Sequence, residues 1–193
     1  MNLDLIIVFL YSYLIGSIPF GLLFTKIFLK KDVREIGSGN IGATNVLRTG
    51  NKLLASLTLI FDILKGYISI YITLTYFNDL IYLSALACFI GHIFSIWLKF
   101  RGGKGIATYL GIISAFSLKF TLIFGVIWLA VLLLFRYSSL SSIVSTLFIF
   151  FYSLILVNYT LSLYLFSVFV IVVFTHRENI IRLKAKKETK IKF

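Results

Sequence analysis

Charged residues are scarce in this chain of 193 residues: they make up 13% of it, whereas hydrophobic residues make up 60%. Soluble domains usually carry about 25% charged residues. Long apolar runs with almost no charge fill most of the length, which is typical of an integral membrane protein. The composition therefore predicts one transmembrane domain over residues 1–193 and no separate soluble domain.

Cysteine and proline each occur only once, as Cys88 and Pro19. A single cysteine excludes a disulfide within the chain and argues against a structural metal site. Pro19 lies inside the first apolar run beside Gly16 and Ser17. Because proline removes a backbone hydrogen bond, we interpret this segment as a helix kink with small residues for close packing.

Acidic residues are few, with seven Asp and Glu against 19 Lys and Arg. They form no cluster with metal-binding spacing, which disfavours a Mg-dependent kinase or phosphatase. A Walker motif is also missing, since Gly103-Lys104 is followed by Gly105, and there is no Gly-x-Ser-x-Gly elbow. We expect no metal and no cofactor. A nucleic-acid partner is not expected either, because no polar domain carries a basic face.

The apolar runs predict an all-α integral membrane protein, a bundle of seven transmembrane helices. The expected spans are 5–28, 53–76, 80–97, 106–118, 120–135, 143–157 and 161–175. Residues 106–135 could alternatively form one long helix that crosses the membrane once. At about 1.5 Å per residue, 13 residues cover only about 20 Å of a core about 30 Å thick. We prefer two crossings, with an outer turn at Lys119, because they keep the basic residues on one side.

Lysine and arginine cluster in the polar gaps and the tail, which the positive-inside rule places in the cytoplasm. The N-terminus is then outside and the C-terminus cytoplasmic. All 19 Lys and Arg lie inside except Lys65, within the membrane, and Lys119, outside. Asp62 and Lys65 share a helix face and predict an intramembrane ion pair. The pair is either structural or orients the polar loops.

Four polar motifs interrupt the apolar runs, at residues 37–48, 99–108, 136–142 and 176–183. The motif 37–48 is the richest, with three glycines, two hydroxyls, two carboxamides and an arginine. Glycine lets the backbone approach a ligand, successive N–H groups form an anion-binding nest, and arginine matches phosphate oxygens. Helix N-termini near residues 43 and 105 would add positive dipole ends. These features predict a phosphate-binding site at the inner membrane surface.

A reaction with a pre-activated donor such as an acyl phosphate needs no covalent enzyme intermediate. The protein has only to position two anionic substrates, stabilise charge on the carbonyl oxygen and remove a hydroxyl proton. The polar motifs contain the groups that these tasks require.

The same motifs resemble a known family. Residues 16–19, 37–48, 62–66, 91–95, 100–108, 136–142 and 176–183 match, in order, the bacterial acyl-phosphate:glycerol-3-phosphate acyltransferases of the PlsY type. The resemblance implies a seven-helix inner-membrane enzyme with a cytoplasmic active site. It would move a fatty acyl group from acyl phosphate to the 1-hydroxyl of glycerol 3-phosphate. The products would be lysophosphatidic acid and phosphate, the first step of phospholipid synthesis. The resemblance implies neither metal nor acyl-CoA, and it implies that a substrate phosphate helps to take the hydroxyl proton. Membrane lipids and a soluble acyl-phosphate synthase are the implied partners.

The resemblance also assigns site residues. The expected catalytic residues are Ser38, Asn45, Arg48, Lys104, His176 and Asn179. The expected substrate-binding residues are Gly39, Asn40, Gly42, Thr44, His92, Arg101, Gly102, Gly103, Gly105, Ser141 and Ser142. Alternatives remain for several of them: packing for His92, helix capping for Ser141, Ser142 and His176, and lipid headgroups for Arg101. For Arg48 and Lys104 the alternative is the positive-inside rule alone, and for 37–48 it is a plain glycine-rich turn.

The chain departs from the family pattern in two places. Lys186 stands where the family usually has glycine, three residues after Arg182-Leu183, and no proline follows the serine patch 138–142. A transporter of a phosphorylated small molecule and a lipid-binding scaffold are the competing functions. Polar motifs on one face argue against the first, and a scaffold would not need Asn40, Asn45 or two histidines.

Overall fold

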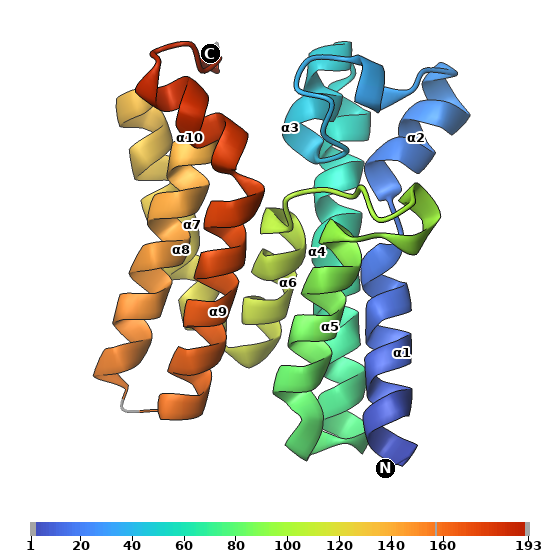
Figure 1. Cartoon of the computed structure of the whole chain (residues 1–193), viewed down its shortest axis with the longest axis vertical. Helices are drawn as coiled ribbons and strands as arrows, with labels where there is room; N and C mark the ends of the chain where they lie inside the picture. Colours follow the sequence, from blue (N-terminus) through green and yellow to red (C-terminus); the bar gives the residue numbers. More distant parts are fainter. Residues whose placement is uncertain (1–2, 157, 192–193) are drawn as a thin grey trace. The chain divides into compact units, whose positions relative to one another are not determined.

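The computed structural model describes residues 3–156 and 158–191, and all regular secondary structure in those ranges is helical. The α-helices are α1 (Leu3–Ser17), α2 (Phe20–Leu29), α3 (Ala43–Val46), α4 (Lys52–Tyr76), α5 (Ile81–Ile93), α6 (Ile106–Phe116), α7 (Leu118–Phe135), α8 (Ser138–Ile155), α9 (Tyr159–Thr175) and α10 (Arg177–Lys184) (Figure 1). The chain forms two compact units, Met1–Ala115 and Phe116–Phe193. We call them the N-terminal and C-terminal units and describe each by itself.

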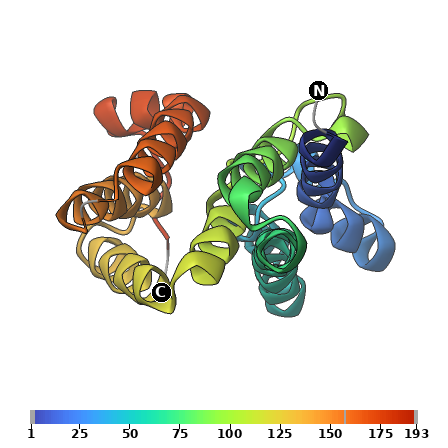
Figure 2. The ribbon, with the colours of Figure 1, turned by 90° about the horizontal axis from the view of Figure 1, so that it is seen from below.

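Helices α1, α4 and α5 form the body of the N-terminal unit, and they run side by side when seen end-on (Figure 2). Small residues let them approach closely. A Cβ atom on Gly16 would lie 2.0 Å from the Cys88 carbonyl oxygen, and one on Gly91 would lie 2.3 Å from that of Tyr13. Between these helices the Ser12 and Ser84 hydroxyls are 2.8 Å apart. Close backbone approach and buried hydroxyl contacts are how helices associate in lipid, where apolar burial supplies little force.

The first expected span is one apolar span, Leu3–Leu29, that is interrupted at Pro19, where the sequence predicted a kink. Helix α1 ends at Ser17 and α2 begins at Phe20. Backbone carbonyls that a continuous helix would use are taken by side chains instead. Ser95 Oγ donates to the Ser17 carbonyl at 2.6 Å, and Lys65 Nζ donates to the Ile18 carbonyl at 2.7 Å. These two contacts make the break tolerable at membrane depth, where an unsatisfied carbonyl is costly.

The apolar stretch 106–135 is two helices, as preferred from the sequence. The break between them lies at Ser117. Lys119 is therefore part of helix α7 and does not lie in the connecting turn that was expected there. Helix α6 has 11 residues and packs on α4 through glycine. A Cβ on Gly111 would lie 1.9 Å from the Ile63 carbonyl oxygen. Among the described residues, five helices are long and apolar enough to cross a membrane, or six if the bent pair α9–α10 counts as one span. The shorter α6 is the remaining expected crossing.

The C-terminal unit packs α8 against both α7 and α9. Helix α8 begins at Ser138, earlier than the expected start at 143, so the serine patch forms its first turns. Ser141 Oγ donates to the Tyr137 carbonyl at 3.0 Å, and Ser142 Oγ to that of Ser138 at 2.9 Å. The last residue of the expected span 143–157 lies outside the described residues.

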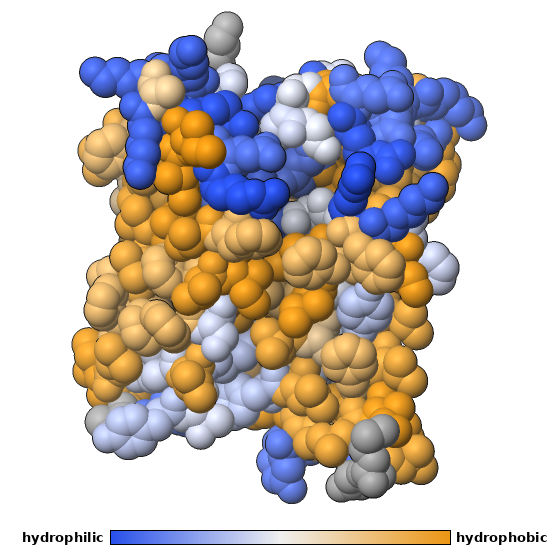
Figure 3. Space-filling view, viewed as in Figure 1, coloured by the Kyte–Doolittle hydropathy of each residue, from blue (hydrophilic) through white to orange (hydrophobic). Residues whose placement is uncertain are grey.

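Hydrophilic side chains gather at one end of each unit taken by itself (Figure 3). In the N-terminal unit this end carries α2, α3 and the polar segment around them. In the C-terminal unit it carries α10 and the segment 185–191 that follows it (Figure 1). The rest of each unit shows mainly apolar side chains, as expected for helices facing lipid.

Candidate active site

Asn45 organises the polar loop 37–48. This side chain is buried on α3. Its Nδ2 lies within 2.9 Å of the Val33 and Ile36 carbonyls and 2.7 Å from that of Asn40. Its Oδ1 accepts a hydrogen bond of 3.0 Å from the Ser38 N–H. The carboxamide is therefore engaged with backbone on both sides, which makes Asn45 a residue that shapes the loop.

Apolar residues inside the polar segment fix it to the helices beneath. Val33, Ile41 and Val46 are buried in one cluster with Leu22 of α2 and Leu54 of α4. A loop held by buried apolar side chains keeps its polar groups in place without having to order them on binding.

Arg48 lies directly over Gly37. A Cβ on Gly37 would come 2.6 Å from Arg48 Cδ and 2.8 Å from its NH1, and the φ of Gly37 is +55°. Only glycine accommodates both the left-handed backbone and the neighbouring side chain. Helix α3 has only four residues, so the positive end expected near residue 43 is weak. The loop therefore presents the guanidinium of Arg48 and backbone N–H groups rather than a long helix end.

The second glycine-rich loop, 102–105, is built on His92. The Gly102 N–H donates to the Ile93 carbonyl at 2.8 Å, and the Gly103 N–H donates to the His92 carbonyl at 3.0 Å. A Cβ on Gly103 would lie 2.2 Å from His92 Nε2. The loop thus fits over the buried imidazole only without side chains at these positions. Lys104 follows this contact, and Gly105 leads into α6 with a φ of +87°.

A buried polar cluster lies below this loop. Thr108 Oγ1 and His92 Nδ1 are 3.1 Å apart, and His92 Nδ1 is 3.8 Å from Asp62 Oδ1. Asp62 Oδ1 is in turn 2.7 Å from Lys65 Nζ, which confirms the ion pair predicted from their spacing. Since Lys65 also holds the α1–α2 break, the pair connects that break to the support of the glycine loop. His92 contacts the loop from behind, and its contact with substrate stays a prediction.

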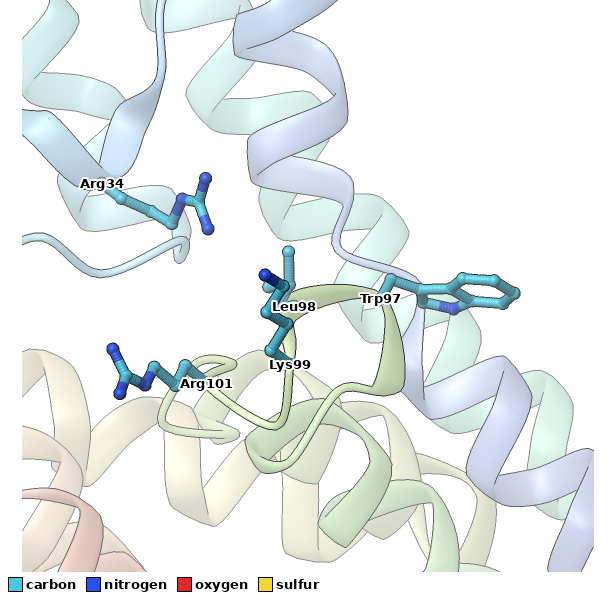
Figure 4. Close-up of a pocket in the computed structure, with 5 residues that line it drawn as sticks. All are labelled: Arg34, Trp97, Leu98, Lys99 and Arg101. Atoms are coloured by element: carbon cyan, nitrogen blue, oxygen red, sulfur yellow. The ribbon is translucent and has the colours of Figure 1, made fainter.

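A basic pocket of about 630 Å³ opens beside the two loops. It is lined by Arg34, Trp97, Leu98, Lys99 and Arg101 (Figure 4). The Arg34 guanidinium makes hydrogen bonds of 2.9 and 2.6 Å to the carboxylate of Asp32. This guanidinium holds the pKa of Asp32 well below its usual range, despite the opposing effect of burial. Arg101, expected to bind substrate, thus lies among other cations at the pocket.

In the C-terminal unit, His176 ends α9 and is buried at the bend of 61° between α9 and α10. Its Nδ1 is 2.9 Å from the Val172 carbonyl. A carbonyl can only accept, so Nδ1 carries a proton, and in the neutral imidazole Nε2 then carries the lone pair. The bond therefore selects the tautomer in which Nε2 accepts a proton or hydrogen bond.

Glu188 connects the tail to this region, a role that the sequence did not suggest. Its carboxylate accepts hydrogen bonds from Asn179 Nδ2 at 2.6 Å, Arg182 Nε at 2.6 Å and Ser139 Oγ at 2.9 Å. Burial raises the pKa of Glu188, but these three hydrogen bonds outweigh it and leave the pKa below its usual value. The turn before it includes Lys186, which adopts a φ of +56° where the family usually has glycine.

We expect Glu188→Gln to loosen the tail, because neutral glutamine loses the ion pair with Arg182. A carboxylate whose pKa is lowered by folding stabilises the protein above its unfolded pKa, about 4.3 for glutamate, and loses that effect as the pH falls through the folded pKa. The free energy of unfolding should therefore differ between native protein and variant at pH 7 and converge in acid. Thermal unfolding between pH 7 and 3 measures this difference.

Glu178→Gln is the matched control. Glu178 lies 3.9 Å from the same arginine, but its side chain is 73% exposed, so its loss should be nearly neutral. Equal effects of the two variants at pH 7 would contradict the role of Glu188.

Comparisons with known proteins decide the family. The family model described as glycerol-3-phosphate acyltransferase matches residues 6–186. The chain belongs to this family. A relative from Pelagibacter ubique named glycerol-3-phosphate acyltransferase is 50% identical, over 98% of this chain and 99% of that protein. One of the same name from Bartonella quintana is 48% identical, over 95% and 90%.

Two solved structures have a fold similar to that of this chain. Both are crystal structures of PlsY, an integral membrane glycerol 3-phosphate acyltransferase. Its glycerol 3-phosphate form matches with a TM-score of 0.91 at 35% identity, and its lysophosphatidic acid form with 0.89 at 34%. Each match covers 98% of this chain and 96% of that one. The chain is therefore a multi-pass integral membrane protein of an acyltransferase family whose reaction belongs to phospholipid synthesis.

The expected site residues divide between the units. The N-terminal unit holds all those between Ser38 and Gly105, in two loops, the pocket beside them and, for His92, helix α5. The C-terminal unit holds Ser141, Ser142, His176 and Asn179. Sequence reasoning missed the contacts of Glu188 and the partnership of Thr108 with His92. Neither left a signal in the sequence, because both depend on long-range folding of the chain.

Proposed function

We propose that this chain transfers a fatty acyl group from acyl phosphate to the 1-hydroxyl of glycerol 3-phosphate. The acceptor oxygen attacks the acyl carbonyl carbon, the bond from that carbon to the phosphate oxygen breaks, and lysophosphatidic acid and inorganic phosphate result. Family membership and the likeness to PlsY in its glycerol 3-phosphate form support this reaction. The observation that carries it is the loop 37–48, ordered by Asn45 with Arg48 placed over Gly37.

Residues of the N-terminal unit are assigned to the phosphates. Arg48, Lys104 and Ser38 hold phosphate oxygens, and Asn45 fixes the loop between them. The glycines and Asn40 of the first loop, Thr44, and the loop 102–105 supply backbone N–H groups and close approach. His92 supports the second loop, and Arg101 attracts the anionic substrates toward it.

Residues of the C-terminal unit are assigned to the acceptor hydroxyl. His176 and Asn179 orient this hydroxyl, and Glu188 holds Asn179. The proton passes to a substrate phosphate oxygen, as the family resemblance implies. Ser141 and Ser142 bind substrate near the start of α8. No metal or acyl-CoA enters this reaction.

The proposal includes the membrane arrangement. Seven helices cross the bacterial inner membrane, with α6 as a short crossing, the N-terminus outside and the C-terminus in the cytoplasm. The polar motifs then face the cytoplasm, where glycerol 3-phosphate is available and a soluble acyl-phosphate synthase delivers the donor. The gathering of hydrophilic residues at one end of each unit supports this orientation (Figure 3).

Release of phosphate tests the reaction. Purified protein receives palmitoyl phosphate and glycerol 3-phosphate, without metal or acyl-CoA, and inorganic phosphate is followed over time. We expect acceptor-dependent release that falls by 100-fold or more, on the order of losing one or two charged hydrogen bonds to a phosphate, in Arg48→Ala and in Lys104→Ala. Both variants should have the same unfolding temperature as the native protein. Failure of folded native protein to release phosphate would overturn the acyltransferase assignment.

One feature favours a transporter as a second candidate, namely the broken helix α1–α2, since transporters place binding sites at such breaks. In this chain the freed Ser17 and Ile18 carbonyls already accept hydrogen bonds from Ser95 and Lys65. Each carbonyl therefore already has a partner within the protein. Uptake of labelled glycerol 3-phosphate into vesicles containing the protein would establish the alternative.

A further inference from the structure

The basic pocket beside the loops has uncompensated positive charge. Arg34 is paired with Asp32, and Lys26 lies 3.6 Å from the same carboxylate. Lys99 and Arg101 differ: within residues 3–156 and 158–191, neither side chain makes an ion pair or hydrogen bond. Two cations that line a pocket without an anion attract one from outside the protein.

The segment that carries these cations also exposes large apolar side chains. Trp97 is 63% exposed, Phe100 is 59% exposed, and Ile96 precedes them on the same short turn. The indole of Trp97 points away from Arg34 and Arg101 (Figure 4). Tryptophan beside cations is typical of the boundary between headgroups and acyl chains. One segment thus offers an apolar face for chains and a charged pocket for a headgroup.

The backbone holds this segment in one conformation. Lys99 and Phe100 both adopt left-handed φ values, of 51° and 61°. The turn is closed by the Phe100 N–H, which donates to the Ser95 carbonyl at 2.9 Å, and by the Arg101 N–H, which donates to that of Leu98 at 3.1 Å. The two cations and the indole are therefore presented together before any ligand binds, which lowers the entropic cost of binding.

We propose that this pocket binds the headgroup of an anionic bilayer phospholipid, with the acyl chains beside Trp97 and Phe100. The phosphodiester meets Lys99 and Arg101, and Arg34 forms the far wall. A soluble phosphate would satisfy the cations but would leave the exposed aromatic side chains without a role. Arg34 and Lys99 lie outside the substrate contacts proposed above, whereas Arg101 is shared with them.

Quenching of Trp97 fluorescence by lipid tests the proposal. The chain has two tryptophans, so Trp128→Phe leaves Trp97 as the single reporter. The protein is placed in phosphatidylcholine nanodiscs with a small fraction of brominated phosphatidylglycerol or of brominated phosphatidylcholine. At low salt we expect the site to prefer the anionic lipid over phosphatidylcholine by about tenfold. The reason is that each cation near a membrane surface contributes about 1 kcal/mol.

Variants identify the groups responsible. Lys99→Gln should reduce the preference by about fivefold, as expected for the loss of one such cation. Lys52→Gln removes an exposed cation elsewhere in the same unit and should leave the preference for the anionic lipid unchanged. Equal quenching by the two brominated lipids would show that Trp97 merely lies in the membrane interface and would overturn the proposal.

A competition arm separates lipid from soluble phosphate. Inorganic phosphate and glycerol 3-phosphate are each added at millimolar concentration. Quenching by the anionic lipid should persist in both cases. If either compound abolished it, the pocket would be a site for soluble phosphates, and the lipid proposal would fall whether or not the protein is an acyltransferase.

Discussion

Lys65→Met is expected to destabilise the protein by about 3–5 kcal/mol, the usual cost of removing one partner of a buried ion pair. Lys65 Nζ lies 2.7 Å from Asp62 Oδ1, and both side chains are almost completely buried. The same ammonium donates to the Ile18 carbonyl, where α1 and α2 separate. The variant leaves both the Asp62 carboxylate and the Ile18 carbonyl without the ammonium that they contact. Unfolding by sodium dodecyl sulfate in mixed micelles measures the loss of free energy.

Two further variants separate the contributions of Lys65. Asp62→Leu combined with Lys65→Met removes both charges, and replacing a whole buried pair by apolar residues is often neutral. The carbonyl of Ile18 still lacks its donor, so about 1–3 kcal/mol should remain. Lys119→Met removes a cation that lies over the Tyr152 ring at 5.5 Å, a contact worth about 1 kcal/mol. If Lys65→Met cost no more than Lys119→Met, the ion pair would not support the fold.

Gly102→Ala is expected to lower kcat/KM for acyl transfer by on the order of 100-fold, the usual effect of misplacing catalytic groups by about 1 Å. A Cβ on Gly102 would lie 2.1 Å from the His92 carbonyl oxygen and 2.7 Å from that of Ile93. Both contacts are to backbone, so the loop itself must move. Lys104 follows in the same loop and would move with it. Steady-state phosphate release with both substrates varied measures kcat and KM.

Gly125→Ala in α7 is the control for Gly102→Ala. Nothing lies within 4 Å of a Cβ at Gly125, so its activity should match the native protein, and its stability should be equal or slightly higher because alanine favours a helix. Unfolding measurements on Gly102→Ala distinguish a displaced loop from a collapsed fold. Native kcat/KM in Gly102→Ala would show that the position of this loop does not limit the reaction.

Most helices could be predicted because lipid imposes a strong signal on sequence. Long apolar runs must be helical and must satisfy their own backbone, so α4, α5 and α9 lie close to their expected ranges. Boundaries near polar residues were less predictable. Helix α8 starts at Ser138 because its serine hydroxyls bond to carbonyls one turn back, which lets hydroxyl-rich sequence continue a helix. The turn expected at Lys119 lies at Ser117, because polarity alone does not fix where a helix begins.

The site was predictable in composition but less so in the roles of its members. Glycine, carboxamide and arginine at 37–48 indicated a loop for anions. The sequence did not show that Asn45 would direct its carboxamide to four backbone groups. It did not show either that Glu188 would lie against Asn179. Such contacts join positions separated by loops or by a bend, and periodicity carries no information about them.

The sequence by itself determined that this protein lies in a membrane, that it is helical, which family it resembles and where its polar motifs occur. These properties depend on composition and local order, which the apolar runs and glycine-rich motifs express directly. Only the tertiary structure decided what each polar group contacts. It showed that Lys65 and Ser95 hold a broken helix and that His92 supports a glycine loop from behind. The reason is physical: a buried polar group must find a partner wherever folding brings one, and that partner is chosen in space.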